Sequence, residues 1–126
     1  MKYMLMIFSE EASLRAASEA EVGQIMGAYR AYTEAVQKAG ILVASDRLRP
    51  VATATTVRVA KGKTEVLDGP YVETKEQFGG YYIIDVPDLD AAISWAARCP
   101  AASRGTMEVR PIWTPVNGQY LDAAAG

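Results

Sequence analysis

The feature that most constrains the fold is a capped amphipathic helix pattern that begins after Ser18 and ends before Gly40. Ser18 and Glu21 have the spacing of a capping box, in which a hydroxyl and a later carboxylate satisfy free amides at a helix start. Apolar side chains then recur at helical spacing, at Val22, Ile25, Met26, Tyr29, Tyr32 (or Thr33) and Val36. Gly40 stands where a left-handed C-cap belongs. We therefore predict one helix over about 19–39, with an apolar face that has to be buried.

Strand patterns account for most of the remaining chain. Apolar runs or β-branched alternation predict strands at 3–8, at 54–59 and 64–67 as a hairpin, at 81–86, and at 107–112. Residues 41–44 form a short apolar segment, and residues 45–50 form a charged connector. Residues 71–77 lack strand alternation and are compatible with one or two helical turns.

A second helix is predicted to begin after Asp88, as its N-cap, and to end at Pro100. Its expected buried stripe consists of Leu89, Ala92, Ile93, Ala96 and Ala97. The order of elements predicts an α+β fold of ferredoxin-like type, a split βαβ sheet with two helices on one face. The other sheet face must also be covered, so we expect a C2 homodimer with the two sheets facing each other. One domain over 1–115 is expected, followed by a loosely ordered C-terminal tail, 116–126.

Composition excludes several classes of function. The formal net charge is -2 and basic residues are spread thinly, so a nucleic-acid partner is not expected. No stretch approaches the roughly 18 apolar residues of a membrane span, and the opening residues lack a signal-peptide cleavage site. The single cysteine, Cys99, rules out an internal disulfide and fits a reducing compartment. We therefore expect a cytoplasmic protein.

The chain has no histidine, and this limits its chemistry. A Ser-His-Asp or Cys-His nucleophile, a His-ligated haem and an ordinary zinc site all require that residue. Proton transfer would have to use Asp, Glu, Lys, Tyr, Cys or a bound water. We expect neither a metal ion nor a cofactor.

Several segments together resemble the signature of the YCII-related, DGPF-type family. They are Ala54 to Arg58, Asp68-Gly69-Pro70-Tyr71, Val72 to Glu76, Gly79 to Val86, and Glu108 to Pro111. The resemblance implies a dimeric α+β barrel with a cleft whose ligand is unassigned. It does not assign a reaction. It also implies a regulatory association with extracytoplasmic-function sigma factors. Smaller relatives carry a His-Asp pair, which this chain lacks, and Tyr71 stands where the motif has Phe.

The first functional hypothesis is a small-molecule cleft beside the Asp68-Gly69-Pro70-Tyr71 loop, whether or not it is catalytic. Asp68, Glu73 and Lys75 are the catalytic candidates, with a carboxylate as base and the ammonium as its electrostatic partner. Tyr71 and Glu76 are candidate ligand-binding residues. The alternative is that Asp68 fixes a turn through its side chain and that the following acidic run is a solvated loop with weak ion pairs.

Two further ligand-binding candidates lie outside that loop. Tyr29 either contacts a ligand or packs in the core, and Arg110 either clamps an anion or is a solvent-facing residue. We interpret three charged residues of the 45–50 connector as surface charge, with the border of the same cleft as the alternative: Asp46, Arg47 and Arg49. The rival hypotheses are a non-catalytic partner of a sigma factor and, by fold analogy alone, a cofactor-independent monooxygenase.

Overall fold

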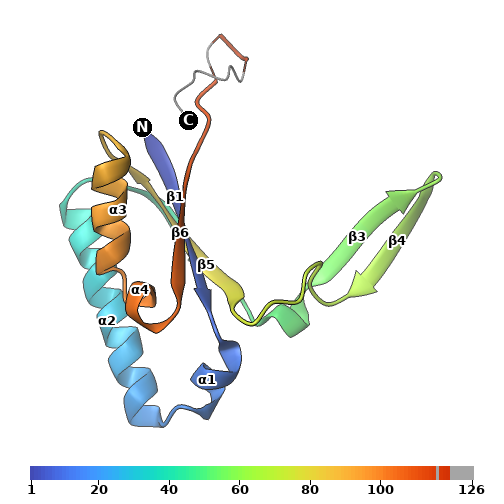
Figure 1. Ribbon diagram of the computed structural model, residues 1–126, viewed down its shortest axis with the longest axis horizontal. Helices are drawn as coiled ribbons and strands as arrows, with labels where there is room; N and C mark the ends of the chain where they lie inside the picture. Colours follow the sequence, from blue (N-terminus) through green and yellow to red (C-terminus); the bar gives the residue numbers. More distant parts are fainter. Residues whose placement is uncertain (116, 120–126) are drawn as a thin grey trace.

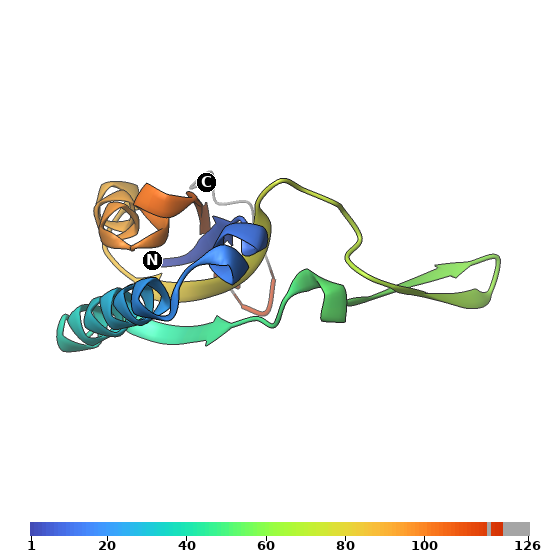
Figure 2. The ribbon, with the colours of Figure 1, turned by 90° about the horizontal axis from the view of Figure 1, so that it is seen from below.

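A four-stranded antiparallel sheet forms the body of the protein in a computed structural model that describes residues 1–115 and 117–119 (Figure 1). The sheet contains β1 (Lys2–Ser9), β2 (Leu42–Arg47), β5 (Gln77–Asp85) and β6 (Thr106–Pro111), in the order β2-β5-β1-β6. The two long helices, α2 (Glu19–Lys38) and α3 (Leu89–Arg98), lie side by side on one face of this sheet (Figures 1 and 2). This is the predicted ferredoxin-like α+β fold.

Both long helices begin at the predicted caps. The Ser18 hydroxyl accepts a hydrogen bond from the Glu21 amide at 3.2 Å, and the Asp88 carboxylate accepts one from the Ala91 amide at 2.9 Å. Gly40 follows α2 with φ at 72°, a left-handed conformation that favours glycine. Local side-chain chemistry therefore sets the limits of α2 to within one residue of the predicted range.

The hydrophobic core lies between the sheet and these two helices. Leu5, Val36 and Ile84 are the largest fully buried side chains. The Tyr32 hydroxyl donates to the Trp95 carbonyl at 2.8 Å, and the Tyr32 ring meets the Tyr82 ring edge-on with centroids 5.1 Å apart. This partly buried hydrogen bond and the ring contacts link α2 to α3 and to β5.

The buried stripe of α3 differs from the predicted one. Ala92 and Ala96 are buried, whereas Leu89, Ile93 and Ala97 are exposed. The helix packs through its small residues because Trp95 fills the space between α3 and Tyr32, with ring centroids 6.4 Å apart. Cys99, one turn after the second alanine, completes the packed face and is 2 % exposed. Burial raises the pKa of its thiol.

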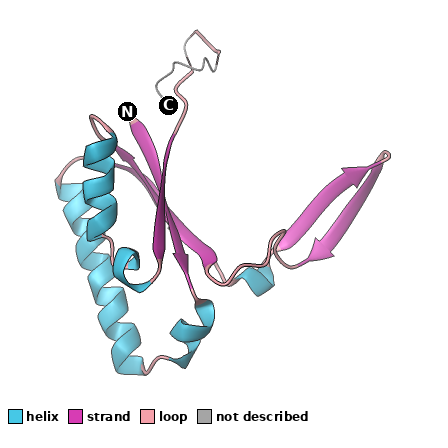
Figure 3. Ribbon diagram, in the orientation of Figure 1, coloured by secondary structure: helices cyan, strands magenta, loops and turns pink. Residues whose placement is uncertain are grey.

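The hairpin of β3 (Thr55–Ala60) and β4 (Lys63–Asp68) forms a separate two-stranded sheet (Figure 3). Lys61 and Gly62 join its strands, and both have positive φ, as a type I′ two-residue turn requires. The hairpin was predicted, but it projects from the body on the side of the main sheet away from α2 and α3 (Figures 1 and 2). We call this projecting hairpin, residues 55–68, the arm.

Two connector predictions are wrong. Residues 45–47 belong to β2 because Ser45, Asp46 and Arg47 pair with Tyr82, Tyr81 and Gly80 of β5, and an edge strand tolerates charged side chains. Residues 71–76 form no helical turn and run as an irregular return from the arm to β5. The short 3₁₀ helix η1 (Val51–Thr53) and the short helices α1 (Glu11–Ala16) and α4 (Ala101–Arg104) had no clear signal in the sequence.

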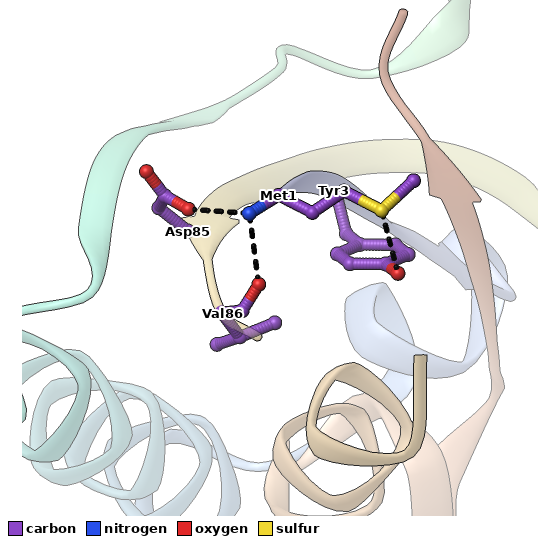
Figure 4. Close-up of polar contacts among 4 residues, drawn as sticks. All are labelled: Met1, Tyr3, Asp85 and Val86. Carbon is purple, nitrogen blue, oxygen red and sulfur yellow. Dashed lines mark hydrogen bonds and ion pairs between the residues drawn. The ribbon is translucent and has the colours of Figure 1, made fainter. Parts of the chain in front are cut away.

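The start of β1 is held against the end of β5 (Figure 4). The amino group of Met1 lies 2.9 Å from the Asp85 carboxylate and donates to the Val86 carbonyl at 3.0 Å. The Tyr3 hydroxyl contacts the Met1 sulfur at 3.3 Å. In the described part of the chain, no helix is both long and apolar enough to cross a membrane. The predicted tail, apart from residues 117–119, lies outside the described residues.

Candidate functional site

A cleft of about 470 Å³ opens between the first half of α2 and the end of the sheet where β1 and β2 finish and β5 begins. Its apolar wall is formed by Ile7, Leu14, Ile25 and Met26, with part of Tyr82. This volume lies within the range of 300–1,000 Å³ typical of small-molecule sites. The cleft therefore has the size and the apolar lining of a ligand pocket.

Three polar side chains converge on this cleft from three different elements: Tyr29 of α2, Arg47 of β2 and Arg104 at the end of α4. Burial raises the pKa of the Tyr29 hydroxyl to about 12, and the charges of Arg104 and Arg47 act in the opposite direction. Both guanidinium groups are thus within electrostatic range of that hydroxyl. Tyr29 remains protonated at neutral pH and is available as a hydrogen-bond donor.

Neither cleft arginine is within ion-pair distance of a carboxylate from the described residues. Arg47 donates a hydrogen bond from Nη1 to the Met26 sulfur at 3.7 Å. Guanidinium groups normally pair with carboxylates or phosphates when they border an apolar site. Within the described part of the chain, the cleft therefore offers a ligand two guanidinium groups that have no carboxylate partner, and one neutral hydroxyl.

Four acidic residues, Glu10, Glu11, Asp46 and Glu76, also line the cleft, and the carboxylates of the last three hold hydrogen bonds within the chain, that of Asp46 to the Tyr81 hydroxyl at 2.7 Å. The Glu11 carboxylate accepts the Val51 amide at 3.0 Å, and the Glu11 amide donates to the Gln77 side chain at 2.9 Å. Glu76 accepts a hydrogen bond from the Thr106 hydroxyl at 2.7 Å. Glu11 therefore ties α1 to both connectors that lead to the arm, and these connectors form the rim of the cleft.

Gly80 of β5 permits the close approach of β2 at the cleft floor. A Cβ at this position would lie 2.8 Å from the Asp46 carbonyl oxygen and 3.4 Å from the Arg47 Cα. No side chain larger than hydrogen fits without moving β2. The glycine thus sets the position from which Arg47 reaches toward Met26 and the cleft.

The structure divides the site residues predicted from the sequence into those that line the cleft and those that do not. Tyr29 and Glu76 line the cleft, whereas Asp68, Tyr71 and Glu73 are exposed and do not line it. Asp68 ends β4 at the base of the arm, and its carboxylate has no hydrogen-bond partner among the described residues. These assignments as functional residues stay predictions.

The turn after Asp68 is held by two hydrogen bonds to the Gly69 backbone, and the described residues give no hydrogen bond to the Asp68 side chain, which the turn hypothesis expected to fix the turn. The Gly69 amide donates to the Ala54 carbonyl at 2.7 Å, and the Thr56 hydroxyl donates to the Gly69 carbonyl at 2.8 Å. Gly69 has φ at 101°, which only glycine adopts readily. The turn thereby closes the base of the arm.

Lys75 and Arg110 lie away from the main cleft. Lys75 borders a second, more open hollow with Phe8, Thr74, Glu76, Thr106 and Glu108. Arg110 is paired with Glu108 on β6, opposite Met4 of β1, and its side chain is 68 % exposed. Among the described residues, no group of three or more carboxylate or thiol side chains is arranged to hold a metal ion.

Sequence reasoning underestimated the two cleft arginines. Arg47 was assigned to surface charge because residues 45–50 were interpreted as a connector. A strand interpretation would have placed Arg47 on the same face as Ser45, opposite Asp46. Arg104 had no signal, because it reaches the cleft only through the short helix α4.

Comparison with known proteins places this chain in a family. The YCII-related domain model matches residues 1–115, nearly the whole chain. The chain belongs to the YCII-related family. An uncharacterised protein, R00369, of Rhizobium meliloti strain 1021 is 38 % identical to this YCII-related chain over 114 residues, which cover 89 % of the chain and 92 % of that protein.

A solved structure supports the fold of this YCII-related chain. It is 5-chloro-2-hydroxyhydroquinone dehydrochlorinase (TftG) from Burkholderia phenoliruptrix AC1100, in complex with 2,5-dihydroxybenzoquinone. The two share a TM-score of 0.54 over 94 % of this chain and 99 % of that chain, with 14 % sequence identity. At this identity the similarity is one of fold.

Proposed function

We propose that this YCII-related protein binds a small organic anion in the cleft between α2 and the sheet. The observation that carries the proposal is that two guanidinium groups, those of Arg47 and Arg104, line the cleft beside the protonated hydroxyl of Tyr29 and have no carboxylate partner among residues 1–115 and 117–119. A carboxylate or phenolate would accept hydrogen bonds from all three groups. The apolar wall around Ile25 and Met26 would bury the hydrocarbon part of the ligand.

A thermal-shift screen followed by calorimetry tests this proposal, because a ligand that binds only the folded state raises the melting temperature. The probes are benzoate, 2,5-dihydroxybenzoquinone and inorganic phosphate. Arg47→Gln and Arg104→Gln are expected to weaken binding by about tenfold or more each, since each removes a charge-assisted hydrogen bond. Arg49→Gln is the matched control, because Arg49 is exposed and does not line the cleft.

Two results would contradict the proposal. If none of the three probes raises the melting temperature, the cleft does not select small anions of this kind. If Arg49→Gln weakens binding as much as Arg47→Gln, the effect comes from the net charge of the protein and not from the cleft.

A second candidate function is an enzyme that acts on a hydroxylated ring compound at the same cleft. It is favoured by the neutral Tyr29 hydroxyl, which can donate a hydrogen bond to a substrate oxygen, and by the dihydroxybenzoquinone bound to the protein of similar fold. The loop residues predicted from the sequence enter this candidate only as predictions, because none of them lines the cleft: Asp68, Tyr71, Glu73 and Lys75. Unchanged binding of an identified ligand in a Glu73→Ala, Lys75→Ala variant would remove the loop from the site. Oxygen uptake with phenols or quinols would distinguish a monooxygenase from other reactions.

We also propose that two copies of the chain associate through the sheet face that α2 and α3 leave uncovered. Met4, Met6 and Ile83 project from that face and are only half-buried within one chain. Apolar side chains on an open sheet face favour contact with another surface. A sigma-factor partner and a cytoplasmic location stay predictions; the buried thiol of Cys99 supports the second.

A further inference from the structure

The arm exposes an apolar face that the other described residues leave uncovered. Val57 and Val66 are directly opposite each other in the register, and Val59 follows on the same face. Their exposed fractions are 58 % for Val57, 61 % for Val66 and 70 % for Val59. The other face of the arm carries the cross-strand pair Arg58 and Glu65, with one exposed apolar side chain, Leu67, near the base. The arm is therefore an amphipathic two-stranded sheet.

Such a hairpin needs a surface against which to pack. An isolated two-stranded hairpin is at best marginally stable in water, and a strand with alternating character normally buries its apolar face. The base of the arm is fixed, because Gly69 bonds to Ala54 and Thr56 bonds to Gly69. No comparable hydrogen bond holds the apolar face of the arm to the rest of residues 1–115 and 117–119. Nothing in this described part of the chain covers the three valines, so another surface has to do so.

The position of the arm indicates which surface that is. The arm extends from the sheet on the side away from α2 and α3, so it stands beside the uncovered sheet face (Figures 1 and 2). A body placed against Met4, Met6 and Ile83 would therefore also lie alongside the arm. We infer that the valine face of the arm packs on a second copy of this chain, so that each protomer of a two-fold dimer clasps its partner.

The buried area that a stable interface needs and the symmetry of a dimer both favour a second copy of the chain over a different protein as the partner of the arm. A stable interface buries about 800 Å² on each partner, more than three valines can supply, so the arm has to act together with the sheet face. A two-fold axis through facing sheets brings both surfaces of each copy into one continuous interface. The inference rests on the proposed homodimer, and it adds the arm as a separate contributor.

The experiment measures the dimer dissociation constant by sedimentation equilibrium. The test variant carries Val57→Thr, Val59→Thr and Val66→Thr. Each substitution replaces one methyl group by a hydroxyl, so the side chain keeps its shape and its strand propensity but becomes polar. The matched control carries Arg58→Thr and Glu65→Thr on the opposite face of the same arm, with the net charge unchanged. Far-UV circular dichroism and the melting temperature of the dissociated protein confirm that both variants are folded.

We expect the valine variant to raise the dissociation constant roughly tenfold or more, and the control to leave it within about threefold of the original. An equal dissociation constant for the valine variant and the original chain would overturn the arm inference but not the proposed dimer through the sheet face. In that case Ile83→Lys should still raise the dissociation constant. A protein that is monomeric at all accessible concentrations would overturn both.

Discussion

The close approach of β2 to Gly80 leads to a prediction that can be tested with two single-methyl variants. In Gly80→Ala the new Cβ would lie 2.8 Å from the Asp46 carbonyl oxygen, closer than real Cβ contacts, and the neighbouring atom is backbone. Overpacking of this kind costs about 1–3 kcal/mol. Replacing a strand glycine by alanine returns about 0.5–1 kcal/mol of backbone entropy. The net loss of unfolding free energy is therefore about 1–2 kcal/mol.

The neighbouring glycine provides the control. Gly79→Ala lies one residue away on the same strand, and a Cβ there meets no atom within 4 Å. We expect this variant to be as stable as the original chain or more stable by about 0.5–1 kcal/mol. Urea unfolding followed by circular dichroism measures both, and the melting temperature of Gly80→Ala should fall by about 4–8 °C. Displacement of β2 also moves Arg47, so the same variant should bind benzoate more weakly.

Equal unfolding free energies for the Gly79→Ala and Gly80→Ala variants would refute the argument, because the two substitutions differ only in what the added methyl group contacts. A loss in both variants would point instead to a general intolerance of side chains on this part of β5. A loss of stability in Gly80→Ala with unchanged benzoate affinity would separate the packing of β2 from the position of Arg47.

Two further predictions concern the cleft and its rim. Glu11→Ala should lower the unfolding free energy by about 1–2 kcal/mol, because the Val51 amide loses its carboxylate acceptor. Glu11→Gln retains an acceptor oxygen and should lower the unfolding free energy less. Chemical denaturation of the two variants measures the difference. The pKa of Tyr29 rises from an ordinary value of 10 to about 12 on folding, so the folded state binds more protons than the unfolded state between these values. Unfolding free energy should therefore fall as the pH rises from 10 to 12, and denaturation at several pH values should show a smaller fall in Tyr29→Phe. An identical pH dependence in that variant would contradict the assignment.

The parts of the fold that were predictable from sequence are those determined by short-range chemistry. Ser18 and Asp88 cap helices through contacts with amides three residues away, and Gly40 ends α2 through its own backbone conformation. The hairpin turn at Lys61 and Gly62 is local in the same way. These features do not depend on where the rest of the chain lies, and the predicted and observed limits agree closely.

The parts that were not predictable depend on contacts between distant segments. The α3 stripe was misassigned because Leu89 and Ile93 are the larger apolar residues, while the helix packs through Ala92 and Ala96 next to Trp95. Arg104 and Arg47 line the same cleft only when α4 and β2 are in place. Composition identifies such residues as charged but does not tell which ones share a cavity.

The buried cysteine gives these experiments an internal probe. Cys99 is the chain's only cysteine, it lies in the core at the end of α3, and burial raises the pKa of its thiol. Thiol reagents attack the thiolate, so in the closed native state this group is protected both by lack of access and by its proton. Labelling occurs only when the region between α3 and the sheet opens. The rate of modification in native buffer therefore reports the free energy of that opening directly, without denaturant and without an engineered label.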